Sequence, residues 1–228
     1  AFVERRGPTQ SEAGVAAVQC LAGDRVWEAG RFGRFSLELA LAACSAITGA
    51  QTRLEQLETF AYSQDEPATA FLIEYRDGFC ATLLILNGFV SGTGYAACVR
   101  DDSASHIESC KCSTYGGLAK ASPGEPDLYS GRYPGSAKGT FAHFSYLARN
   151  VEEMMVTGIP STPIERTLLA SGMLEAALVS RREGGRRVVT DWLGVAYRRE
   201  RDLPPYFPLG PEPRGAALLP WPPGGANL

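Results

Sequence analysis

Histidine is scarce in this sequence, which has only two among its 228 residues, so imidazole bases and imidazole metal ligands are few. No apolar run approaches the roughly 18–20 residues of a membrane-spanning helix, and no signal-peptide pattern opens the chain. We therefore expect a cytoplasmic protein that contacts no membrane. The net charge of −3 argues against general binding of nucleic acid. The first residue is Ala rather than Met, so we expect a trimmed chain or a fragment.

The six cysteines show neither disulfide-scaffold spacing nor a C-x-x-C pair, and several lie in apolar segments. A free cysteine behaves there as a small hydrophobic residue, so reduced thiols are expected. The sequence has no G-x-S-x-G turn that would expose a nucleophilic serine. Its adjacent acidic residues, Asp101 with Asp102 and Glu152 with Glu153, diverge and form no acid–base pair. We therefore predict no self-sufficient active site.

The sequence is organised around a predicted helical hairpin within 143–190. Gly158 supplies a stop for its first helix, and Pro160 forbids continuation. Polar residues occupy the other faces of this helix, which makes it amphipathic. The apolar residues at helical spacing are Phe144, Leu147, Val151, Met154 and Met155.

The second helix of the hairpin opens at Thr162-Pro163-Ile164-Glu165. Thr162 is placed as N-cap, Pro163 as the first helical residue, and Glu165 closes a capping box. Apolar residues then occupy nearly every side of the helix, which predicts burial from two directions. Gly184 and Gly185 end the helix, and a strand is predicted at 187–190.

The N-terminal third predicts short elements separated by polar turns. Ser36 is placed to cap a Leu- and Ala-rich helix that Gly49 ends. The segment 1–13 resembles a frayed helix end followed by a polar turn, and 51–69 indicates a loop with some helix. The predicted elements outside the hairpin are a first strand at 15–21, a helix at 37–47 and a last strand at 195–198.

Asp77-Gly78 and Asn87-Gly88 tolerate the positive φ angles of tight turns, and so predict a β-meander. The strand at 79–86 is apolar on both faces. Because we expect helices on one side only, the second face needs a partner, either another subunit or another domain. The predicted strands of this region are 69–76, 79–86, 89–100 and one within 105–115.

Strands run together and helices run together, which predicts an α+β fold: a mainly antiparallel open sheet with helices packed on one face. We assign 1–200 to this domain. The Gly-, Pro- and Ser-rich segment 116–139 is expected to be a long surface loop. The remainder, 201–228, is a Pro-rich tail that forms no regular structure, with eight prolines after Asp202.

Two motifs suggest ligand binding but lack the context it needs. Gly92–Ala97 matches the G-x-G-x-x-A dinucleotide fingerprint, which works only where a strand feeds a helix. Here strand alternation continues, so we predict no nucleotide site. The other motif is a set of possible metal ligands on one strand face, and one strand offers a zinc ion two neighbouring ligands, not four. We therefore predict no metal site at His106, Glu108, Cys110 and Cys112.

His143 stands at or just before the first helix of the hairpin. It can contact a ligand in a cleft or hydrogen-bond a loop carbonyl, and we favour the second. It remains the one candidate for a residue that faces substrate. No other residue is assigned a catalytic, cofactor-binding or metal-binding role.

The amino-acid sequence resembles the C-terminal part of the Gfo/Idh/MocA family of NAD(P)-dependent oxidoreductases. The helical hairpin and the strand after it are similar to the family's closing segment, and the meander is similar to its sheet strands. The opening is similar to a less-studied branch. The segments that carry the resemblance are 3–29, 71–78, 84–88, 143–158, 163–169 and 174–188.

The resemblance implies the second half of a two-domain enzyme. In that family a Rossmann domain precedes an α+β domain, whose open sheet shapes the substrate site and makes subunit contacts. The Gly-rich cofactor turn, the Glu-Lys-Pro lysine and the Asp…His pair of the family have no matching positions here, so no catalytic residue is carried over. The resemblance thus implies a homo-oligomer that joins a missing Rossmann domain.

For the full-length enzyme the resemblance implies NAD or NADP and a sugar- or polyol-type CH–OH substrate. The chain alone is expected to bind no cofactor and to be inactive, because the nicotinamide does the hydride chemistry. The alternative is a free-standing, non-catalytic binding or scaffold module derived from the same domain. The long segment 101–140 and the tail motivate this alternative, since extra surface segments often carry interactions.

Overall fold

The structure is a computed structural model. It describes residues 11–62, 67–90, 93–100, 105–112, 151–152, 154–160 and 162–198. Contacts divide the chain into two compact units. The first comprises Ala1–Ser91, Ala96–Ser109 and Thr162–Glu200, and the second comprises Gly92–Tyr95, Cys110–Ser161 and Arg201–Leu228. The predicted boundary between domain and tail lies outside the described residues.

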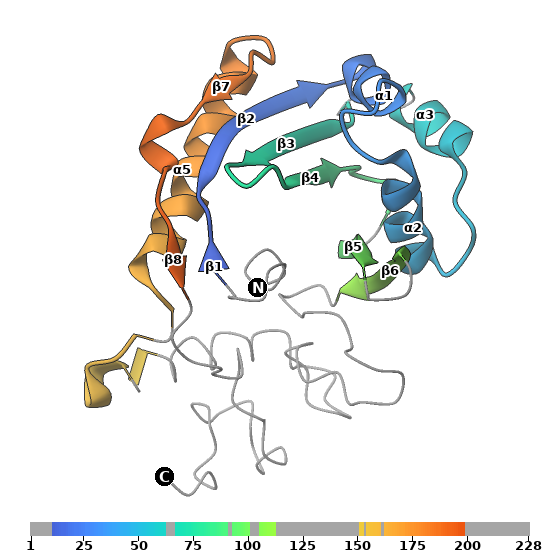
Figure 1. Ribbon diagram of the computed structural model, residues 1–228. Helices are drawn as coiled ribbons and strands as arrows, with labels where there is room; N and C mark the ends of the chain where they lie inside the picture. Colours follow the sequence, from blue (N-terminus) through green and yellow to red (C-terminus); the bar gives the residue numbers. More distant parts are fainter. Residues whose placement is uncertain are drawn as a thin grey trace, which may run out of the picture. The chain divides into compact units, whose positions relative to one another are not determined.

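Figure 1 shows strands and helices from distant parts of the sequence meeting in the first unit. The strands of the described part of the chain are β1 Ser11–Glu12, β2 Val15–Ala22, β3 Thr69–Tyr75, β4 Cys80–Ile85, β5 Thr93–Arg100, β6 Ser105–Cys112, β7 Val188–Val189 and β8 Tyr197–Arg198. The helices are α1 Asp24–Arg31, α2 Leu37–Thr48, α3 Leu54–Tyr62 and α5 Ile164–Arg182, with a 3-10 turn, η2, at Asp191–Leu193. None of the helices in these ranges is long and apolar enough to cross a bilayer.

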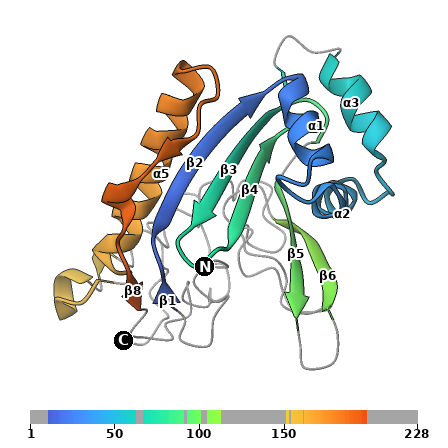
Figure 2. The same cartoon turned by 45° about the horizontal axis from the view of Figure 1, so that its top comes forward.

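The main sheet has four strands in the order β4-β3-β2-β7, and each neighbouring pair is antiparallel (Figure 2). Val18 of β2 pairs with Ile73 on one side and with Val188 on the other. A register shift between Val15 and Ala17 bends the start of β2. The predicted α+β fold with an open antiparallel sheet is therefore confirmed.

Several local turn and cap signals are confirmed. The Ser36 side chain accepts a hydrogen bond of 3.2 Å from Leu39 N, and Gly49 ends the helix with φ 73°. Between β3 and β4, Gly78 has φ 85°, and Phe79 N donates to Asp77 Oδ1 at 3.2 Å. Within the first hairpin helix, residues 151–152 and 154–157 are helical, and Gly158 ends it with φ 71°. Its predicted start lies outside the described residues.

The strand pairings differ from the predicted meander. Strand β5 pairs with β6 in a separate two-stranded sheet rather than with β4. Ser11 and Glu12 form β1, which pairs with β8, where a polar turn was expected. Helix α1 was not expected, and α3 gives regular structure to a segment predicted as mainly loop. The β1–β8 pairing joins strands far apart in sequence, which residue patterns do not show, whereas β5 and β6 are neighbours in sequence and only the expected β4–β5 pairing failed.

Helices cover both faces of the main sheet, so the prediction that they pack on one face only was wrong. Alternation along β3 divides the core into two clusters. Leu72 belongs to a cluster with Trp27, Cys44 and other residues of α1–α3. On the opposite face, side chains of β2 and β3 pack with α5, with Tyr75 alongside the helix. Each face is covered by a different part of the chain.

Helix α5 buries one stripe, not two. Its buried residues share one side that faces β2 and β7. They are Leu169, Gly172, Ala176, Ala177 and Ser180. The capping box was also wrong: the helix begins one residue later, with Pro163 as N-cap at ψ 143° and no side-chain cap bond. An extended ψ at Pro163 places Thr162 outside the helix.

Buried polar contacts fix α5 on the sheet. The Ser180 hydroxyl accepts a hydrogen bond from Cys20 N at 2.8 Å and donates to Arg186 O at 2.6 Å. Close packing at Gly172 adds to this, because a Cβ there would overlap Leu193 Cδ2 and would lie 3.2 Å from Leu193 Cγ. Leu193 is fully buried, in an interior of the kind that is close-packed in proteins.

The substitution Gly172→Val should therefore destabilise the domain. We expect a loss of about 1–3 kcal/mol in the free energy of unfolding, the usual cost of overpacking. Ala170→Val, at an exposed position of the same helix, is the matched control and should cost about 0.6 kcal/mol through helix propensity. Denaturant unfolding of both variants measures the difference. Equal midpoints would contradict the close approach of α5 to η2.

Candidate functional site

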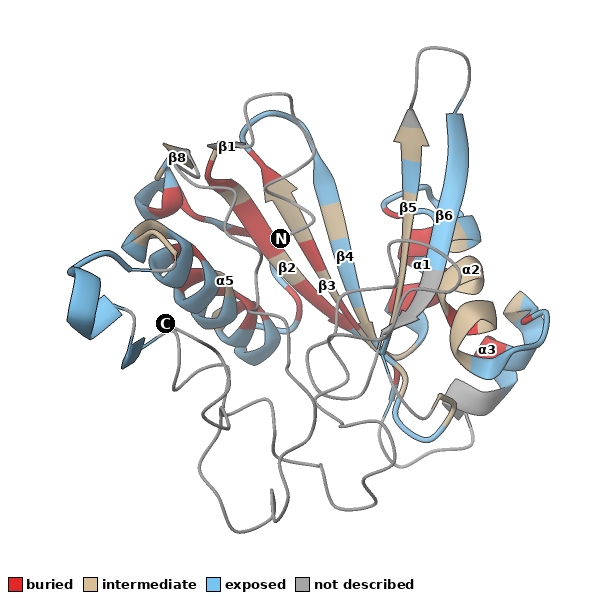
Figure 3. Cartoon of the chain, turned by 90° about the horizontal axis from the view of Figure 1, so that it is seen from below, coloured by how far each residue is buried: buried red, intermediate tan, exposed pale blue. Residues whose placement is uncertain are grey.

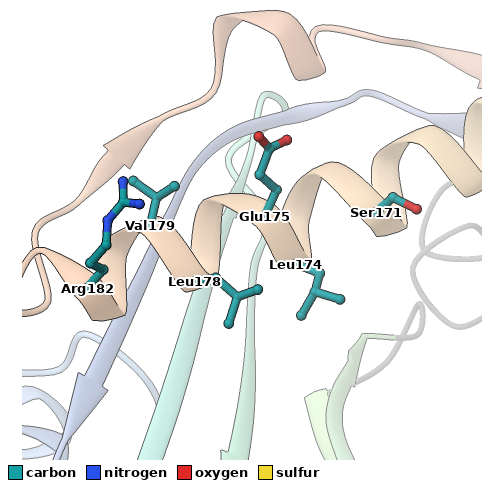
Figure 4. Close-up of a pocket in the computed structure, with 6 residues that line it drawn as sticks. All are labelled: Ser171, Leu174, Glu175, Leu178, Val179 and Arg182. Carbon is teal, nitrogen blue, oxygen red and sulfur yellow. The ribbon is translucent and has the colours of Figure 1, made fainter.

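The outward side of α5 exposes two leucines among polar and charged residues. Ser171, Leu174, Glu175, Leu178, Val179 and Arg182 line a shallow hollow of about 550 Å³ along it (Figure 4). Leu174 is 61% exposed and Leu178 is 55% exposed. Residues four apart lie one above the other on a helix, so these leucines form a continuous ridge. We call the residues 171, 174, 175, 178 and 182 the outer face of α5.

The outer face of α5 is suited to docking rather than to catalysis. Its leucines offer aliphatic surface, and Glu175 and Arg182 place one charge of each sign beside them. Amphipathic helices bind partners through such i, i+4 anchors with charged borders. The hollow contains no histidine, cysteine or paired carboxylates that could move a proton.

A second exposed apolar surface lies on β4, on the side of the sheet that carries α5. Alternation places Phe79, Leu83 and Ile85 there, together with the partly buried Ala81. Their exposed fractions are 40%, 54% and 37%, respectively. Figure 3 shows the contrast, with β2 largely buried and β4 exposed or intermediate. We call Phe79, Leu83 and Ile85 the β4 patch.

The opposite face of the sheet carries a charged cluster. The Arg187 Nε atom donates to both carboxylate oxygens of Glu74, at 2.9 and 3.1 Å, and its Nη2 also donates to Glu74. Arg34 Nη2 lies 3.9 Å from Glu74 Oε1 and donates to Gln19 Oε1 at 2.9 Å. The hydrogen bond from Arg187, with the charges of Arg187 and Arg34, holds the pKa of Glu74 below its usual value.

The dinucleotide fingerprint lies in a strand. The residues from Thr93 to Ala97 belong to β5, which runs on to Arg100, so no helix N-terminus follows the glycines. Gly92 lies outside the described residues. The prediction that strand alternation continues through this motif is confirmed, and the geometry that would hold a pyrophosphate is missing from β5.

The possible metal ligands are partly described. His106 and Glu108 share a face of β6, with His106 Nε2 at 3.3 Å from Glu108 Oε1, and both are exposed. No group of three metal-binding side chains is present among the described residues. The side chains of Cys110 and Cys112 lie outside the described part, as does His143.

The described thiols are free. Cys20 and Cys44 are buried, and Cys80 and Cys98 are exposed. Burial raises the pKa of the Cys20 thiol, which the nearby charge of Arg181 offsets in part, and burial also raises the pKa of Cys44. Protonated, buried thiols are poor nucleophiles, so both act as core residues.

The sequence did not predict the charged cluster. Glu74 and Arg187 are 113 residues apart, and nothing local links them. One signal was available, namely a single acidic residue on a strand whose neighbours are apolar, which calls for a cation nearby.

The Glu74–Arg187 pair makes stability depend on pH. Because the folded state lowers the pKa of Glu74, the pair stabilises the protein above the unfolded pKa and is lost as pH falls through the folded pKa. Both side chains are partly exposed, so the effect should not exceed about 1 kcal/mol. Urea unfolding at neutral pH and at pH values below the unfolded pKa of a glutamate should show this loss, and Glu74→Gln should remove it. An unchanged pH slope in Glu74→Gln would contradict the assignment.

The described residues thus supply apolar docking surfaces on the α5 side and a structural ion pair on the other side. Comparison of the chain with protein-family models, curated proteins and solved structures finds no match. Function therefore has to be argued from these surfaces and from the sequence.

Proposed function

We propose that this chain is the C-terminal substrate-binding and oligomerisation domain of an NAD(P)-dependent oxidoreductase of the Gfo/Idh/MocA type. The single observation that carries the proposal is that α5 buries one side against the sheet and exposes two leucines on the other. Its outer leucines, Leu174 and Leu178, need a partner surface. A domain that joins a nucleotide-binding half and further subunits provides such partners.

The order of elements supports the proposal. A long helix ends at Gly184–Gly185, and the chain then returns as β7 to pair with the first long strand, β2. The sequence of this closing segment is the part that resembles the family most closely. The open antiparallel sheet is the architecture that the resemblance implies for a second domain.

In the proposed enzyme the cofactor is NAD or NADP, and it supplies the hydride chemistry. The α5 hollow holds no acid–base pair, and the proposed part of this chain is to shape the substrate site and to dock the catalytic half. A sugar- or polyol-type CH–OH group is the proposed substrate class. His143 remains the candidate for a residue that faces this substrate.

The decisive experiment starts from the coding DNA upstream of Ala1. An in-frame strand, Gly-rich turn and helix there would encode the proposed Rossmann half. That half, purified and mixed with this chain, should oxidise sugars or polyols with NAD or NADP, whereas each part alone should not. If the mixture gives no activity, or if no such segment is encoded, the chain is better described as a non-catalytic binding module.

Charges on the outer face of α5 should weaken association without unfolding the domain. We expect Leu174→Lys with Leu178→Lys to lower the affinity for the nucleotide-binding half or for another copy at least tenfold, since lysines add charge to an apolar contact. Leu174→Met with Leu178→Met keeps the surface apolar and is the control. Light scattering and circular dichroism give the mass and the fold. Unchanged association in the lysine variant would remove α5 from the interface.

A further inference from the structure

Strand β4 is the outermost strand of the main sheet, and no described residue pairs with it on the side away from β3. Tyr75 N donates to Phe79 O at 2.8 Å, and antiparallel bonding alternates from that point. With Ile73 opposite Ala81, the main-chain groups of Ala81 and Leu83 face β3. Those of Thr82 and Leu84 face outward, where they offer donors and acceptors to another strand.

This edge has none of the features that normally block strand addition. Natural proteins protect open edges with lysines, prolines or very short strands. Between Asp77 and Arg100 the sequence has no charged residue and no proline. Thr82 is exposed, and Leu83 is 54% exposed. An edge of six residues with exposed apolar side chains is competent to pair.

The other edge of the same sheet is protected. Strand β7 has only two residues, and Arg186 and Arg187 precede it. Thr190, just after β7, turns its polar groups inward: its N–H donates to Ala16 O at 3.0 Å and its hydroxyl to Val15 O at 2.9 Å. A sheet with one open edge and one closed edge can pair once and then stops.

We propose that β4 is an assembly edge at which two copies of this chain pair antiparallel along Cys80–Ile85, joining their four-stranded sheets into one. A two-fold axis brings the same uncharged strand against itself, so no like charges oppose each other. A strongly charged partner strand would find no opposite charge on β4. This pairing sets the β4 patches of both copies side by side on the α5 side of the joined sheet. The proposal does not depend on the dehydrogenase assignment.

The test uses Thr82→Pro in the full chain. Because the Thr82 N–H faces outward, proline removes a donor to the second copy but no bond to β3, and edge strands tolerate proline. We expect the dissociation constant of the β4 pair to rise at least tenfold, so that sedimentation velocity gives half the wild-type mass. Thr82→Val keeps the N–H and is the matched control, with the wild-type mass expected.

Thr82→Lys is the second variant, should proline disturb folding. It leaves the backbone intact and places like charges together at the two-fold axis, so it should also halve the mass while the near-ultraviolet circular dichroism is unchanged. Equal masses for Thr82→Lys and Thr82→Val would overturn the proposal. So would a monomeric wild-type chain, which would mean that another segment of the chain or another protein occupies the edge.

Discussion

The burial of β2 on both faces is the constraint on which the rest of the fold depends. Val15 and Ala17 are fully buried, and Val18 and Leu21 nearly so, on alternating sides of the strand. A strand that is apolar on both sides must lie between two layers, as in sheets covered on both faces. The layers come from opposite ends of the described chain: α1–α3 follow β2 directly, and α5 returns to it. The bond from Cys20 N to Ser180 Oγ spans 160 residues.

The sequence was a good guide at several turns and caps whose cause is local. Ser36, Gly49 and Gly78 each act through the backbone of their own turn, and each is placed as predicted. The wrong predictions include a local one, the capping box at Thr162, and others that concern the choice of strand partner. Strand β5 has the pattern of a meander strand, yet its partner is β6 rather than β4, and period-2 alternation carries no information about which neighbour a strand chooses.

The same reasoning applies to the docking surfaces. The sequence shows apolar residues on many sides of α5. Which of these sides the chain itself covers depends on where β2 and β7 lie. The prediction of burial from two directions failed for the described residues because only one layer contacts the helix. The Glu74–Arg187 pair was missed for a related reason, since it forms only once β7 has paired with β2 and brought Arg187 beside β3.

The two faces of the sheet differ in what it would cost to cover them. On the α5 side, the β4 patch and the two outer leucines of α5 are apolar, so covering them with a partner removes hydrophobic surface from water. On the other side, a partner would have to desolvate Glu74 and two arginines, and buried ion pairs seldom recover that cost. Association should therefore be confined to the α5 side and the β4 edge. That leaves the charged cluster in water, where the hydrogen bonds from Arg187 to Glu74 tie the start of β7 to β3 across β2.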